Sequence, residues 1–94
     1  MKTPKEFALH QCYVNHYDTT AVIIFDLPKK SNVTLTIYDN AGKELATLVK
    51  DQELQAGIHQ FEYDKTEEFF YKIIAKCGSE IFSAVKKCLP QTTI

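Results

Sequence analysis

NVTLTIYDNAGKELATLV, residues 32–49, contains two runs in which apolar and polar residues alternate. The runs flank DNAG at residues 39–42, a cluster of turn formers. Because successive side chains of a strand point to opposite faces, this stretch predicts a β-hairpin closed by a glycine bulge. In the first arm we expect Val33, Leu35 and Ile37 to point inward. The inward face of the second arm stays open.

The same period of two recurs on both sides of this hairpin. Seven strands are expected, at residues 7–13, 20–27, 32–38, 45–49, 58–63, 69–76 and 80–89. Lys50 to Glu53 is interpreted as a loop. Outside the hairpin, the expected inward residues are Ala21, Ile23, Phe25, Leu27, His59, Phe61, Tyr63, Phe69, Tyr71, Ile73 and Ala75.

The spacing of these strands indicates the fold class. Turn formers recur about every ten residues, and no helical period of useful length occurs. The sequence therefore predicts an all-β fold, a seven-stranded β-sandwich of the immunoglobulin or fibronectin type. With 94 residues we expect one domain over 1–94, with a core at about 7–89 and tails at 1–6 and 90–94.

Charge and composition exclude several partners. The formal charge is −1, and every basic residue is a lysine, so nucleic acid is not expected as a partner. The longest uncharged apolar run, residues 21–25, is far too short to insert in a membrane. Localisation stays open between a cytoplasmic protein starting at Met1 and a secreted or cell-surface domain of a longer chain.

Three cysteines, Cys12, Cys77 and Cys88, exclude a dense disulfide framework. A Cys12–Cys88 disulfide would need their Cα atoms within about 7 Å. We favour buried free thiols, because cysteine often serves as a small apolar residue. No metal site is expected, since the cysteines, His10 and the other histidines, His16 and His59, lack short paired spacings.

No motif for catalysis or cofactor binding is present. The sequence has no GxSxG elbow and no glycine-rich phosphate loop. Asp51, Glu53, Glu67 and Glu68 are interpreted as solubilising loop charges. We therefore predict a non-enzymatic protein without a cofactor.

Four apolar residues are candidates for an interaction surface: Val22, Ile24, Phe70 and Ile74. All are expected on outward sheet faces, where they are more apolar than a solvated face requires. One explanation is that neighbouring strands cover them or that the faces are inverted. The other is a surface for a protein partner, a preceding domain or a homo-oligomer, with an edge strand as a second route.

Six segments repeat the pattern of a known family. Residues 7–15 (FALHQCYVN) correspond to FxLxQNYPN, 19–28 (TTAVIIFDLP) to TTIxFxLP, 32–49 to xVxLxIYDxxGxxVxTLV, 56–64 (AGIHQFEYD) to AGxHxxxWD, and 70–73 and 82–87 to the last two strands. The chain thus resembles the C-terminal sorting domains of bacterial type IX secretion cargo and the related immunoglobulin-like domain of flagellar hook-capping proteins. The matching motif positions include Tyr38, Asp39, Gly42, Gly57, His59 and Lys86.

The resemblance implies a non-enzymatic sorting or cell-surface attachment module. The chain also departs from the family pattern, because NHYD at residues 15–18 replaces the proline-rich NPFNP and residues 90–94 run past the usual end. These departures favour the alternative, a free-standing structural or protein-interaction module that has lost the sorting role.

Overall fold

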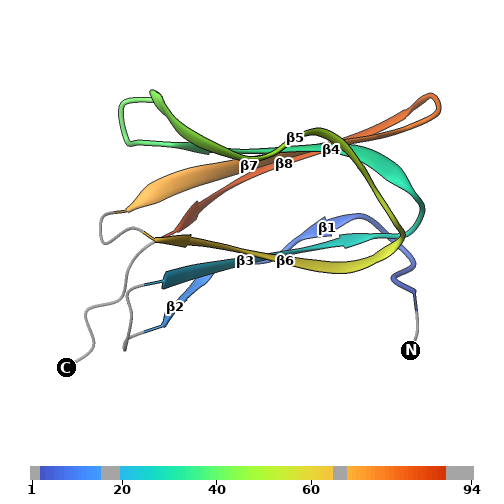
Figure 1. The fold of residues 1–94 in the computed structure, drawn as a ribbon, viewed down its shortest axis with the longest axis horizontal. Coiled ribbons are helices and arrows are strands. Elements are labelled where there is room, and N and C mark those ends of the chain that lie inside the picture. The colour runs from blue at the N-terminus through green and yellow to red at the C-terminus, as the bar shows by residue number, and fades with distance from the viewer. Residues whose placement is uncertain (1–2, 16–19, 65–67, 89–94) are drawn as a thin grey trace.

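Two antiparallel sheets face each other in the computed structural model, which describes residues 3–15, 20–64 and 68–88 (Figure 1). In the first sheet, the central strand β3 (Thr20–Leu27) pairs with β6 (Gly57–Asp64) on one side and with β1 (Ala8–Leu9) and β2 (Tyr13–Asn15) on the other. The second sheet has the order β5-β4-β7-β8, with bounds Glu44–Leu54, Ser31–Tyr38, Phe69–Cys77 and Glu80–Cys88.

The predicted all-β fold with two packed sheets is confirmed, but the described residues form eight strands rather than seven. The additional strand arises because the first extended segment is broken at residues 10–12. Its two halves, β1 and β2, both pair with β3, and the backbone nitrogen of His10 donates to the Ile24 carbonyl at 2.9 Å.

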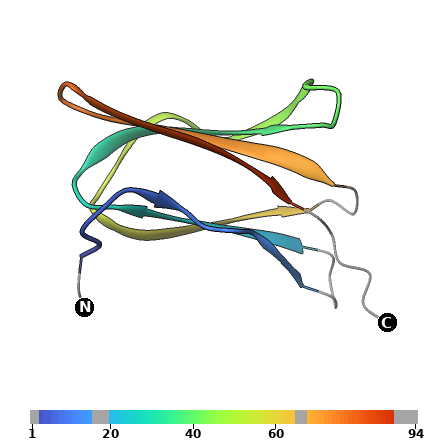
Figure 2. The ribbon, with the colours of Figure 1, turned by 180° about the vertical axis from the view of Figure 1, so that it is seen from behind.

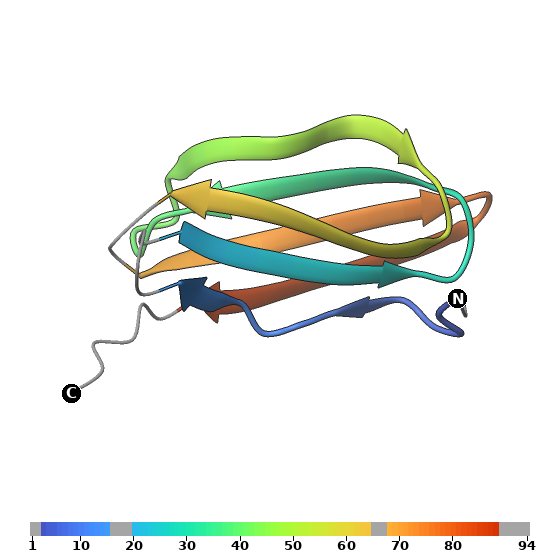
Figure 3. The same cartoon turned by 60° about the horizontal axis from the view of Figure 1, so that its bottom comes forward.

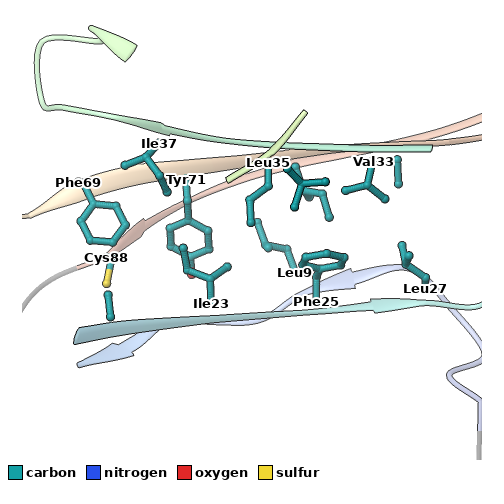
Figure 4. Close-up of a cluster of buried hydrophobic side chains, with 14 residues drawn as sticks. Leu9, Ile23, Phe25, Leu27, Val33, Leu35, Ile37, Phe69, Tyr71 and Cys88 are labelled. Atoms are coloured by element: carbon teal, nitrogen blue, oxygen red, sulfur yellow. The ribbon is translucent and has the colours of Figure 1, made fainter. Parts of the chain in front are cut away.

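The core lies between the sheets and follows the predicted alternation (Figure 4). Strands β3, β4 and β7 each place every second residue inside, because one face of each strand is covered by the opposite sheet. The predicted inward residues Ala21, Ile23, Phe25, Leu27, Val33, Leu35, Ile37, Phe69, Tyr71, Ile73 and Ala75 are all fully buried. Those of β6, His59, Phe61 and Tyr63, are half-buried.

The loop predicted at residues 50–53 is wrong, since β5 continues to Leu54. Asp51 has a φ of 48°, and the register of β5 against β4 shifts between Val33 and Leu35. The Asp51 N–H donates to the Thr34 hydroxyl at 3.1 Å, which supports the irregular residue. Charged residues are tolerated here because β5 is an edge strand, where bulges and charges are common.

Beyond Leu54 the chain crosses from the second sheet to the first and enters β6, as Figure 3 shows. The expected hairpin of β7 and β8 is present, in register from Phe69 opposite Cys88 to Cys77 opposite Glu80. Strands β1 and β8 lie on the same side of the sandwich (Figure 2).

The preference for free thiols at Cys12 and Cys88 is also wrong, because these residues form a disulfide. Their Cα atoms lie 5.7 Å apart, within the range that a disulfide requires. The bond joins the break between β1 and β2 to the end of β8, and so links the two sheets. Cys77 is unbridged. The expectations for His16, for Glu67 and for residues 90–94 lie outside the described residues.

Candidate interaction surfaces

The four apolar residues predicted to form an interaction surface lie on opposite sides of the molecule. Val22 and Ile24 belong to β3 of the first sheet, whereas Phe70 and Ile74 belong to β7 of the second. Val22 is only 5% exposed, and the other three are half-buried. The structure thus brings them together in two separate pairs, each on one outer face.

The outer face of β7 and β8 is rich in lysine and apolar side chains. We call it the basic face, and it consists of Phe70, Lys72, Ile74, Lys76, Ile81, Ser83, Val85 and Lys87. Ile81 is 67% and Val85 55% exposed, the most exposed apolar side chains of this face. The Lys87 ammonium lies 5.6 Å from the centre of the Phe70 ring and 3.6 Å from the Glu68 carboxylate.

Sequence reasoning missed Ile81 and Val85, although a signal was available. Residues 80–88 alternate, and Phe82, Ala84 and Cys88 are the better core residues, since they lie opposite the buried Ala75, Ile73 and Phe69 in register. Pairing the two strands of the hairpin would therefore have placed Ile81 and Val85 outside.

The outer face of β3 and β6 has the opposite charge. We call it the acidic face, and it consists of Thr20, Val22, Ile24, Asp26, Ile58, Gln60, Glu62 and Asp64. Ile58 is 63% exposed. His10, in the break between β1 and β2, approaches this face, and its Nε2 lies 3.0 Å from Asp26 Oδ2.

The family-motif positions at the hairpin tip hold the turn. The carboxylate of Asp39 accepts hydrogen bonds from the N–H groups of Ala41 at 2.9 Å and Lys43 at 2.8 Å. Gly42 has a φ of 86°, a conformation that glycine adopts at low cost. Tyr38 ends β4 on the outer face, opposite Phe70 in register. These groups shape the hairpin and bring no reactive side chain to its tip.

The crossover from β5 to β6 uses two further motif positions. Gly57 begins β6 with a φ of 143°, and the His59 ring nitrogen Nε2 lies 2.7 Å from the Gln55 carbonyl oxygen. The face of the same imidazole ring stacks on the Phe25 ring, with the two ring centroids 5.4 Å apart. His59 thus fixes the corner between the sheets. It packs on Phe25, which also stacks on Phe61.

A hydrogen-bonded tyrosine secures the first strand. The Tyr71 hydroxyl donates to the His10 carbonyl and accepts from the Cys12 N–H, both at 2.8 Å. Burial raises the pKa of Tyr71, and the Cys12 hydrogen bond offsets part of that rise. Lys86, the last motif position, lies opposite Tyr71 in register and is half-buried.

Two open hollows of about 460 Å³ each lie near the start of the chain. One adjoins the stacked rings of Phe7 and Phe82 and the ion pair of Lys29 with Glu80. The hydrogen bond to Glu80 and its charge raise the pKa of Lys29. The other hollow lies beside Asp26. Neither hollow is lined by a cysteine, serine or threonine nucleophile.

Comparison with models of known families, with curated proteins and with solved structures finds no match for this chain. Within the described part of the chain, no three potential metal ligands gather. Nor do these residues include a helix long and apolar enough to cross a membrane.

Proposed function

We propose that this chain is a non-enzymatic β-sandwich of the immunoglobulin or fibronectin type that serves as a sorting or surface-attachment module of an exported protein. The observation that carries the proposal is the Cys12–Cys88 disulfide, which joins the break between β1 and β2 to the end of β8. Disulfides of this kind form and persist in oxidising compartments outside the cytoplasm. A disulfide therefore suits a small domain that is exported from the cell.

The strand order supports the sandwich type. Strand β5 pairs at the edge beside β4, after which the chain crosses to β6 on the opposite sheet. The first sheet thus contains β1, β2, β3 and β6, and the second contains β5, β4, β7 and β8. Fibronectin type III and related cell-surface domains share a sandwich of two such antiparallel sheets.

The roles of the motif residues support the resemblance as a likeness of fold. Asp39, Gly42, Gly57 and His59 hold the hairpin tip and the crossover, the two irregular places that this topology requires. Motif side chains that only support the backbone favour a non-catalytic function, because the function of a common fold depends on the sites that are added to it.

A fusion experiment tests the sorting role. The chain is placed after an exported reporter enzyme in a bacterium that has the type IX pathway, and reporter activity is measured on intact cells and in the periplasm. We expect the reporter to reach the cell surface when it carries the chain and to stay in the periplasm without it. A folded, disulfide-bonded fusion that stays in the periplasm would contradict the proposal.

The basic face favours a second candidate function, a protein-interaction module. Ile81 and Val85 are exposed beside three lysines, and such a mixture suits a partner surface better than a purely solvated sheet. Light scattering at micromolar concentration and capture of partners with the immobilised chain test this function. A strict monomer that captures no partner would contradict it.

A further inference from the structure

We propose that copies of this chain stack face to back, with the basic face of one copy on the acidic face of the next. The inference rests on the second candidate function and names its partner as another copy of the chain. It does not depend on export, so its test and the fusion experiment can fail separately.

The charged residues of β3 and β6 differ in sign from the outward charges of β7 and β8, whereas the edge strand β5 carries Lys50 together with Glu44, Asp51 and Glu53. The strands of the first sheet contain no lysine, and their acidic residues are Asp26, Glu62 and Asp64. The charged residues at outward positions of β7 and β8 are Lys72, Lys76 and Lys87, whereas Lys86 and Glu80 fall on the inward alternation of β8. The two outer faces therefore attract each other, whereas two basic faces or two acidic faces repel.

The charges also occur at matching levels along the strands. We count outward residues from the end of the sandwich where β3 passes into β4. The first level holds Asp26 on the acidic face and Lys76 on the basic face. The third level holds Glu62 on the acidic face and Lys72 on the basic face. In both faces the two charges are four residues apart in register, about 13 Å at the usual strand rise.

Apolar side chains lie at the same levels. At the first level the acidic face exposes 63% of Ile58 and the basic face 67% of Ile81. At the second level Ile24 and Ile74 are both half-buried. A stack that keeps the strand direction and sets β3 over β7 of the next copy therefore places Asp26 near Lys76 and Ile24 near Ile74, with Glu62 one strand away from Lys72.

Such a contact joins two different faces, so it is heterologous. Each added copy presents the same free faces as the last, and the stack grows without a fixed number of subunits unless it closes into a ring. The contact depends on exposed ion pairs, which salt weakens.

Sedimentation velocity of the full chain tests the inference. At about 20 mM salt, where the screening length is long, the sedimentation coefficient should rise with protein concentration past that of a dimer. At about 1 M salt the chain should sediment as a monomer, because the screening length falls to about 3 Å.

Charge reversal identifies the faces. Glu62→Lys and Lys72→Glu should each weaken association about tenfold, since each replaces an attraction by a repulsion. An equimolar mixture of the two variants should associate again, because each supplies the face that the other lacks. The double variant with both changes should associate on its own. Lys43→Glu makes the same change in net charge as Lys72→Glu, but at the hairpin tip, and should have no effect.

Three results would overturn the inference. The first is a wild-type chain that stays monomeric at several hundred micromolar in low salt. The second is a dimer of fixed size that withstands both single charge reversals. The third is a mixture of Glu62→Lys and Lys72→Glu that stays monomeric while wild type associates. Circular dichroism and thermal unfolding of each variant establish that it is folded before its association is measured.

Discussion

The hydroxyl of Tyr71 lies 2.8 Å from the backbone nitrogen of Cys12, the residue that is bridged to Cys88. The same hydroxyl donates to the carbonyl of His10. Residues 10–12 form the break between β1 and β2, where the pairing with β3 is interrupted. One buried hydroxyl and one disulfide therefore hold the first strand against the opposite sheet.

Tyr71→Phe should lower the free energy of unfolding by about 1–3 kcal/mol, because it leaves the His10 carbonyl and the Cys12 N–H without their partner. Urea unfolding followed by circular dichroism measures the change. Tyr38→Phe is the matched control, since Tyr38 lies on the outer face. Equal losses in the two variants would show that the Tyr71 hydroxyl has no special role.

Stability should fall at alkaline pH in a way that depends on Tyr71. Its folded-state pKa is raised above the ordinary value of 10.0, so the folded protein keeps this proton where the unfolded chain has lost it. The contribution is complete below pH 10 and disappears as pH rises through the folded pKa. Unfolding curves between about pH 8 and 12 should therefore show a smaller alkaline loss for Tyr71→Phe than for wild type. Identical losses would contradict the assignment.

Loss of the disulfide should destabilise the fold strongly. The bridge closes a loop with a sequence separation of 76, for which chain entropy gives about 4 kcal/mol. Denaturant unfolding of the double variant Cys12→Ser with Cys88→Ser measures this loss. Cys77→Ser serves as the control, because Cys77 is unbridged. A double variant as stable as the control would mean that the bridge does not constrain the unfolded chain.

Gly42→Val should cost roughly 1 kcal/mol or more, because a β-branched residue rarely adopts positive φ. An added Cβ at Gly42 meets no atom within 4 Å, so the cost comes from the backbone conformation and not from a collision. Gly42→Asn should lose less, since asparagine tolerates this conformation. Thermal unfolding separates the two variants, and equal stability of Gly42→Val and wild type would contradict the turn.

Most of the architecture is predictable from the sequence, because apolar alternation records which face of a strand is covered. Val33, Leu35 and Ile37 are an example, and all three are fully buried. The loop predicted from the charges of Lys50 to Glu53 is wrong, because an edge strand with an irregularity at Asp51 accommodates charged residues.

The surfaces are less predictable because they depend on how the strands are paired. A period of two identifies an outer side for Val22 and for Phe70 but does not tell which sheet each belongs to. The sequence leaves the Cys12–Cys88 disulfide as the less favoured alternative for a related reason, since a cysteine in a strand looks like any small apolar residue until the neighbouring strand is known. Here that neighbour brings Cys12 to Cys88.

The most direct test of the account is the state of the three cysteines in protein recovered from its own cells. Free thiols are alkylated at lysis, and peptides are mapped by mass spectrometry without reduction. We predict a linked pair of peptides containing Cys12 and Cys88, with Cys77 alkylated, because the proposed export would place the module in an oxidising compartment. Alkylation of all three cysteines would contradict both the disulfide and the proposed export.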